Sequence, residues 1–95
     1  MIKIIAQLSF KKETVAKAID LAAELVVATR KEKGCIQYDL LRANDEPEKL
    51  VILETWESQE VLDVHTASEH FTRIIPQLDA LCVTPTIVTS YTQWI

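Results

Sequence analysis

The segment EKLVILETWESQEVLDVHTASEHF, from Glu48 to Phe71, contains the pattern that decides the fold. Its first ten residues alternate as a strand does, with successive side chains on opposite faces. One face carries an acid among apolar side chains: Leu50, Ile52, Glu54 and Trp56. A carboxylate on the same face as a tryptophan is unusual in an apolar strand. We therefore predict that this strand, from Glu48 to Glu57, lies beside a functional site.

Two helices are expected after this strand. Ser58 is a suitable N-cap for a short helix from Gln59 to about His65. A second helix is predicted from Ser68 to about Leu81, because its apolar residues recur at helical spacing. Pro76 lies inside the second helix and is expected to kink or split it at about Ile75.

The remaining sequence supplies three strands and one long helix. Alternation predicts a strand over Ile2–Phe10, and apolar residues at spacings of three and four predict a helix over Thr14–Lys33, stopped by Gly34. Strands follow over Cys35–Asn44 and Thr86–Ile95. The order β-α-β-β-α-β predicts an α+β, ferredoxin-like fold. Its four-stranded antiparallel sheet would carry both helices on one face.

Several strands have apolar residues on both faces, which a sheet with one face in water does not need. Leu50 and Ile52 lie on one face of their strand, and Val51 and Leu53 lie on the other. In the strand Cys35–Asn44, Ile36 and Leu40 lie on one face and Leu41 lies on the other. We expect two chains to pack sheet against sheet as a homodimer. A monomer with an unusually apolar face is the alternative.

Composition excludes several classes of protein. The 95 residues suffice for a single domain, 1–95, and the net charge of −4 with no basic cluster argues against nucleic acid as a partner. No apolar run is long enough to span a membrane or to act as an export signal. Cys35 and Cys82 lack metal-binding spacing, so we expect free thiols in a cytoplasmic protein.

The two histidines, His65 and His70, are the first candidates for catalysis. Histidine is the side chain whose unperturbed pKa lies nearest neutrality, so either ring could act as a base; the alternative is a structural histidine at a helix end. On one continuous helix the two rings would point in different directions, and no cysteine or aspartate completes a ligand set. We therefore expect no metal site.

Glu54 is the third catalytic candidate, because a buried carboxylate needs a partner or a raised pKa. Arg42 or Arg73 could pair with it, which would make it structural instead. Four residues are candidates for substrate binding, of which Trp56 and Phe71 could equally be core: Tyr38, Trp56, Phe71 and Arg73.

These residues carry a resemblance to a known family. The chain resembles the antibiotic biosynthesis monooxygenase family over nearly its whole length, through the run EKGCIQY at Glu32–Tyr38, the run ETWES at Glu54–Ser58, His65, and SEHF at Ser68–Phe71. The resemblance implies a dimeric α/β barrel and a small aromatic or hydrophobic substrate. It also implies oxidation of a quinol or phenol by oxygen without metal, flavin or haem: a base deprotonates the substrate, and the anion reacts with oxygen to give a quinone.

Other activities of similar proteins remain as alternatives. Haem-degrading relatives carry an Asn, a Trp and an axial His where this chain has Leu8, His65 and Ile75, so haem chemistry is not expected. An isomerase of small phosphorylated diketones would need cationic groups in its pocket, for which Arg42 and Arg73 are the candidates. A non-enzymatic dimer that binds a hydrophobic ligand is the third possibility.

Overall fold

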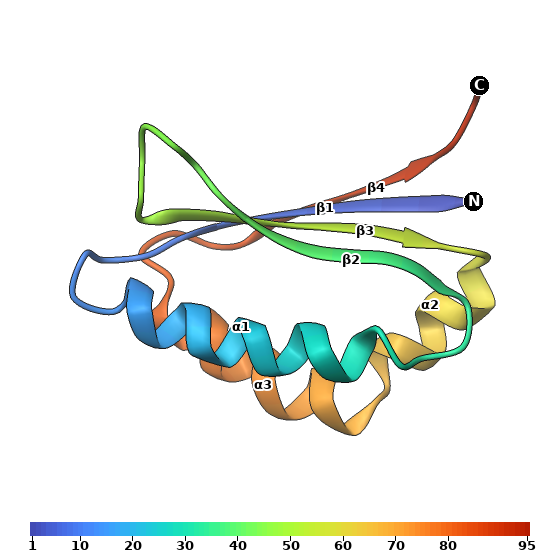
Figure 1. The fold of residues 1–95 in the computed structure, drawn as a ribbon, viewed down its shortest axis with the longest axis horizontal. Helices are drawn as coiled ribbons and strands as arrows, with labels where there is room; N and C mark the ends of the chain where they lie inside the picture. Colours follow the sequence, from blue (N-terminus) through green and yellow to red (C-terminus); the bar gives the residue numbers. More distant parts are fainter.

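The structure, a computed structural model, describes all residues from Met1 to Ile95. The elements follow the predicted order (Figure 1): β1 (Ile2–Ser9), α1 (Val15–Thr29), β2 (Cys35–Arg42), β3 (Lys49–Trp56), α2 (Gln59–Thr66), α3 (Glu69–Leu81) and β4 (Ile87–Thr92). Both the second and the last strand are shorter than the sequence predicts. No helix is long and apolar enough to cross a membrane.

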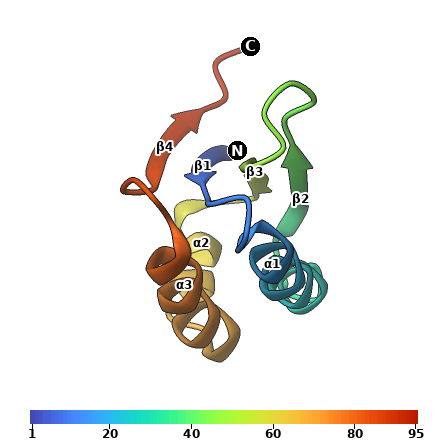
Figure 2. The same cartoon turned by 90° about the vertical axis from the view of Figure 1, so that its left-hand side faces the viewer.

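The strands form one sheet in the order β2-β3-β1-β4, with every neighbouring pair antiparallel. Figure 2 shows all three helices beneath the sheet and none above it, which confirms the ferredoxin-like α+β prediction. α1 and α3 pack beside each other and run in opposite directions (Figure 1). The functional site predicted beside β3 would therefore lie between one face of the sheet and the helices.

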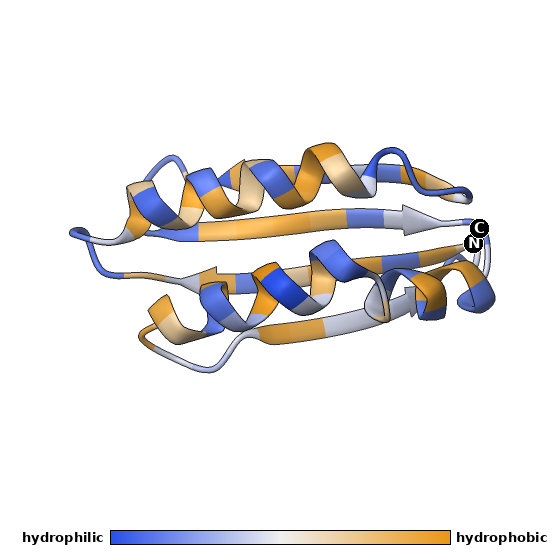
Figure 3. Ribbon diagram, turned by 90° about the horizontal axis from the view of Figure 1, so that it is seen from below, coloured by the Kyte–Doolittle hydropathy of each residue, from blue (hydrophilic) through white to orange (hydrophobic).

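Strand register decides which residues meet under the helices. Ile4 of β1 lies opposite Glu54 of β3, and Leu8 lies opposite Leu50. These side chains belong to the buried inner face, as the alternation of β3 predicts. Seen from the helix side, the helices mix apolar and polar segments (Figure 3), as expected for helices that bury one face.

The first helix ends earlier than predicted, and Gly34 does not terminate it. α1 stops at Thr29, and the next residues form turns in which the Cys35 amide donates to the Glu32 carbonyl at 3.2 Å. Gly34 has a φ of +85°, the left-handed region that favours glycine. Its carbonyl accepts a hydrogen bond from the Glu57 amide at 3.0 Å, so the glycine fixes the entry to β2 against the end of β3.

Pro76 does not split the last helix, contrary to the sequence prediction. α3 continues from Glu69 to Leu81 with the proline inside it. Pro76 has no amide to offer the preceding turn, but it lies on the exposed side, where water can solvate a freed carbonyl. The neighbouring Arg73 carbonyl also accepts a bond from the Gln77 side chain at 2.9 Å. The buried residues Ile74 and Leu78 hold the helix on the core.

The sheet face away from the helices is apolar in its middle. Ile5 lies opposite Leu53, and Val51 lies opposite Leu41. Leu41 is 47% exposed, and Ile87 and Tyr91 of the edge strand are 59% and 49% exposed. This outer sheet face, defined by Ile5, Leu41, Val51, Leu53, Ile87 and Tyr91, is left without a partner within the chain.

We predict that Gly34→Ala destabilises the fold by more than a typical surface substitution. A Cβ at this position would lie 2.7 Å from Cγ1 of Val61, and the left-handed backbone adds its own cost. Left-handed backbone costs about 1–2 kcal/mol, and overpacking costs about 1–3 kcal/mol. Urea unfolding of wild type and variant measures the loss.

The double variant Gly34→Ala/Val61→Ala separates the two causes. It should be less destabilised than the sum of the single variants, because the clash disappears while the backbone strain remains. A Gly34→Ala protein as stable as wild type would contradict the assigned role of the glycine.

Candidate active site

A pocket of about 610 Å³ lies between the inner sheet face and the helices α2 and α3. Its walls are mostly apolar and include Ile4, Ala6, Leu8, Ile52, Phe71 and Ile75. Tyr38, Glu54, His65, Asp79 and Cys82 supply its titratable groups. No Lys or Arg side chain lines it. An apolar pocket with a few convergent polar groups is the usual form of a small-molecule site.

His65 forms part of this wall and is almost completely buried, with 1% of its surface exposed. The short helix α2 presents it, and the Ser58 side chain caps that helix by accepting from the Val61 amide. The ring packs against Trp56, Phe71 and Tyr38, with centroid distances of 4.6, 5.0 and 5.4 Å. These contacts fix the position of the imidazole.

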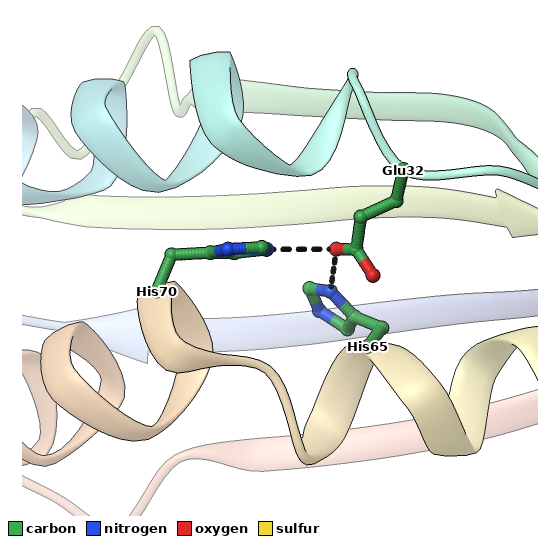
Figure 4. A group of neighbouring side chains, drawn as sticks. All are labelled: Glu32, His65 and His70. Atoms are coloured by element: carbon green, nitrogen blue, oxygen red, sulfur yellow. Dashed lines mark hydrogen bonds and ion pairs between the residues drawn. The ribbon is translucent and has the colours of Figure 1, made fainter.

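One carboxylate holds both histidines (Figure 4). Glu32, in the turn after α1, accepts a hydrogen bond from His65 Nδ1 at 2.7 Å on its Oε2 atom. The same oxygen accepts from His70 Nε2 at 2.8 Å. An ionised carboxylate can only accept, so each ring carries a proton on the nitrogen that faces Glu32. The two histidines therefore converge on one atom although their helix positions differ.

The bond to Glu32 determines what His65 can do. With the proton on Nδ1, a neutral His65 has a free lone pair on Nε2, and that buried atom has no partner within the chain. Burial lowers the pKa of His65, and the hydrogen bond that its ring donates to Glu32 opposes this without cancelling it. The ring is therefore neutral near pH 7 and able to accept a proton at Nε2.

Glu54 lies on the inner face of β3 and also lines the pocket. Its carboxyl group accepts a 2.8 Å hydrogen bond from the indole Nε1–H of Trp56. Burial raises the pKa of Glu54 to about 7, and the Trp56 hydrogen bond opposes that rise. The site thus holds a carboxyl group that changes its protonation near neutral pH.

Neither arginine considered for Glu54 pairs with it. Arg42 Nε donates to the Pro47 carbonyl, and Arg73 forms surface ion pairs with Glu24 and Glu69. Burying a guanidinium group in an apolar pocket costs free energy, whereas both arginines find partners outside the pocket. Arg73 is therefore placed outside the pocket, away from any substrate there.

The other predicted substrate-binding residues divide into two groups. Tyr38 and Phe71 line the pocket. Burial, and to a lesser extent the charge of the nearby Glu54, raises the pKa of Tyr38, so its hydroxyl stays protonated. Trp56 is completely buried behind the pocket wall, where it supports His65 and Glu54. His70 also lies outside the lining; it is linked to the site through Glu32 and through the His65 ring, whose centroid is 6.0 Å from its own.

Glu32 is the site residue that sequence reasoning did not single out. It appears there only inside the EKGCIQY run, and it lies 33 positions before His65. Nothing in local periodicity indicates a partner so distant, so only the motif could have pointed to it. Glu32 also adds a third potential metal-ligand atom to the two histidines. One such atom from each of Glu32, His65 and His70 lies within 4.8 Å of the other two.

Known proteins share this fold and sequence. A family model described as antibiotic biosynthesis monooxygenase matches residues 1–77. A Mycobacterium tuberculosis protein named "Putative monooxygenase Rv0793" is 37% identical over 65 residues, which are 68% of this chain and 63% of that protein. A Bacillus subtilis protein named "Putative monooxygenase YcnE" is 32% identical over 71 residues, 75% of each chain.

A solved structure described as an antibiotic biosynthesis monooxygenase superposes with a TM-score of 0.95 at 36% identity, covering 100% of both chains. The fold and pocket define a small ferredoxin-like protein with a mostly apolar pocket between its sheet and its helices. The sequence match then identifies it further: the chain belongs to the antibiotic biosynthesis monooxygenase family.

We predict that Glu54 makes stability fall as pH rises. Its pKa is about 7 when folded, above the ordinary 4.5, so the stability it contributes is complete below pH 4.5 and is lost as pH rises through about 7. Glu54→Gln should remove this loss, which is on the order of 3 kcal/mol for a shift of this size.

Urea unfolding at pH 5 and pH 8 measures the difference. Glu57→Gln, which removes an exposed carboxylate three residues later, is the matched control and should keep the wild-type profile. Equal pH dependence in wild type and Glu54→Gln would show that Glu54 is not the group responsible.

Proposed function

We propose that this protein is a monooxygenase that oxidises a quinol or another phenolic substrate with molecular oxygen. The observation that carries the proposal is His65 on the wall of an apolar pocket, with an Nε2 atom that is buried and has no partner within the chain. A phenol bound there would donate its hydroxyl proton to that nitrogen, which gives the buried atom the partner it lacks. The family and its relatives' names support oxygenation as the reaction class.

The proposed reaction balances without an external reductant. His65 removes the hydroxyl proton of a phenol, and the electron-rich anion reduces oxygen. In a phenol with a free para position, the ring carbon para to the hydroxyl forms a bond to one oxygen atom and loses its hydrogen. In a quinol, whose para carbon already carries a hydroxyl, a free ring carbon next to a hydroxyl takes the oxygen atom and loses its hydrogen instead, so that the quinone formed is a hydroxyquinone. The second oxygen atom leaves as water with that hydrogen and the hydroxyl proton, so the products are one quinone and one water. Neither step needs a flavin or haem.

Each polar group has a proposed part in this chemistry. Glu32 holds the His65 tautomer and stabilises the imidazolium that forms, because a carboxylate beside Nδ1 favours the charged ring. Glu54, with a pKa of about 7, can give a proton to the departing oxygen or take one from it. Phe71 and the aliphatic wall hold the aromatic ring of the substrate and exclude water.

The charges of the pocket weigh against the isomerase alternative. A phosphorylated diketone would bring negative charge into a pocket lined by Glu54 and Asp79 and by no Lys or Arg. The ligand-binding alternative has some support, because His65 packs closely on Trp56 as a structural histidine would. The open volume of about 610 Å³ beside the ring favours a bound molecule under either reading.

We also propose that the protein works as a homodimer, joined through the outer sheet face. That face presents adjoining apolar side chains from all four strands, including Leu41, Leu53 and Ile87. Contiguous apolar surface of this kind marks an interaction site. A second copy of the same face would bury it by a two-fold packing of sheet on sheet.

Oxygen consumption tests the proposed activity. Metal-free protein is incubated with a panel of hydroquinones and naphthols, each against its autoxidation blank. His65→Ala should lower turnover by about 100-fold or more, because a general base contributes about 10²–10⁴-fold. Labelled oxygen should enter the quinone as one atom per molecule, and added catalase should return no oxygen, since water is the other product.

Val64→Ala changes an exposed neighbour on the same helix and should keep wild-type turnover. Unchanged turnover in His65→Ala would remove His65 from the mechanism. Saturable binding of the same phenols without any oxygen uptake would replace the monooxygenase proposal with the ligand-binding one.

Light scattering tests the dimer. Wild type should have about twice the mass of one chain, and Leu53→Glu should reduce it to one chain mass by placing a charge in the middle of the outer sheet face. Val27→Glu is the control, since Val27 is an exposed apolar residue on α1. A wild-type protein of single-chain mass would contradict sheet-to-sheet packing.

A further inference from the structure

We infer that Glu32, His65 and His70 form a binding site for a divalent transition-metal ion of the zinc class, and that the ion inhibits the protein when it is bound. Two imidazole nitrogens and one carboxylate are a common zinc donor set, with the remaining position open to water. Here these three donors come from the turn after α1, from α2 and from α3, and they meet at one place (Figure 4).

The donor atoms are close enough for an ion to reach all three after a small movement. Glu32 Oε2 lies 2.7 Å from His65 Nδ1 and 2.8 Å from His70 Nε2. Around a tetrahedral zinc ion, with ligands at about 2.0–2.1 Å, the donors are about 3.4 Å apart. The carboxylate therefore has to withdraw by less than about 1 Å. The two imidazole nitrogens, which lie within 4.8 Å of each other, have to approach by up to about 1.4 Å to reach the tetrahedral spacing. Glu32 lies in a turn rather than inside a helix.

Charge supplies an independent reason for a cation at this place. The Glu32 side chain is only 13% exposed, and no Lys or Arg pairs with it. Its second oxygen, Oε1, is buried and has no hydrogen-bond partner within the chain. A largely enclosed carboxylate with an unused oxygen and no Lys or Arg partner is poorly compensated. A dication would neutralise the charge and could use Oε1 as a further ligand.

The site is also accessible from solvent. His70 is the most exposed of the three side chains, at 16%, and His65 is the least, at 1%. An ion can therefore bind His70 and Glu32 first and then displace the hydrogen bond between Glu32 and His65. The aromatic rings around His65 keep its Nδ1 directed at the site.

The inhibitory effect rests on the proposed function. A neutral histidine that binds a metal through Nδ1 carries its proton on Nε2. That is the nitrogen proposed to accept the substrate proton, so an occupied site removes the base. Metal binding and proton abstraction are therefore mutually exclusive at His65, and the metal-free protein is the active form.

Metal binding is tested directly, without any activity measurement. Chelator-treated wild-type protein is titrated with zinc chloride by calorimetry and with cobalt chloride by visible absorption. We expect one ion per chain with micromolar or tighter affinity, and cobalt bands of a low-coordinate nitrogen and oxygen site. His70→Gln and Glu32→Gln should each weaken zinc binding by at least tenfold.

Glu69→Gln is the matched control, because Glu69 is an exposed carboxylate next to His70 and should leave zinc affinity unchanged. Thermal unfolding of each variant checks that it is folded, and His70→Gln is the more conservative change if Glu32→Gln fails to fold. No saturable binding to wild type, or equal binding to wild type and His70→Gln, would overturn the inference.

Oxygen uptake with and without zinc tests the inhibitory part. Zinc should stop turnover in wild type, and a chelator should restore it. Stimulation by zinc would overturn the inhibitory part. If zinc binds and no oxygen is consumed under any condition, the metal site stands and the proposed oxygenation fails. If turnover occurs and zinc neither binds nor inhibits, the metal site fails alone.

Discussion

A single partly buried carboxylate joins the parts of this protein that make the site. Glu32 lies in the turn between α1 and β2 and accepts hydrogen bonds from His65 on α2 and His70 on α3. Without Lys or Arg beside it, its charge depends on those two imidazoles. The helices can therefore approach the turn only in an arrangement that brings both rings to the same oxygen, because an unpaired buried charge is costly.

The turn that carries Glu32 is fixed by the only glycine of the chain. Gly34 adopts a left-handed backbone, bonds to the Glu57 amide and leaves no space for a Cβ beside Val61 of α2. The same few residues thus join the end of β3, the start of β2 and the helix that presents His65. Stability and site geometry are determined together here, since a shift of the turn would move Glu32 away from His65.

The pocket combines two groups whose environments shift their pKa values so that the uncharged form of each is favoured. Burial lowers the pKa of His65 and raises the pKa of Glu54 to about 7. Both effects have the same physical cause, which is the loss of water around a charged form. A neutral base and a carboxyl group near its midpoint, in a pocket without cations, suit the deprotonation of an uncharged aromatic hydroxyl better than the binding of a phosphate.

The sequence by itself determined the order of the elements, the antiparallel sheet, the helices on one face and the inner face of β3, because periodicity of two or 3.6 residues is a local property. It also indicated His65, Glu54 and Tyr38, which the structure places in one pocket. It did not determine where α1 ends or that Pro76 stays within α3, since caps and core packing decide these. Only the tertiary structure brought Glu32 to the histidines, separated Arg73 from the pocket and gave Glu54 a tryptophan as its partner. The pairings of Glu32 with the histidines and of Arg73 with Glu24 join residues far apart in the chain, whose positions carry no common pattern. Glu54 and Trp56 share a strand face in the sequence, but their hydrogen bond is a feature of the folded structure.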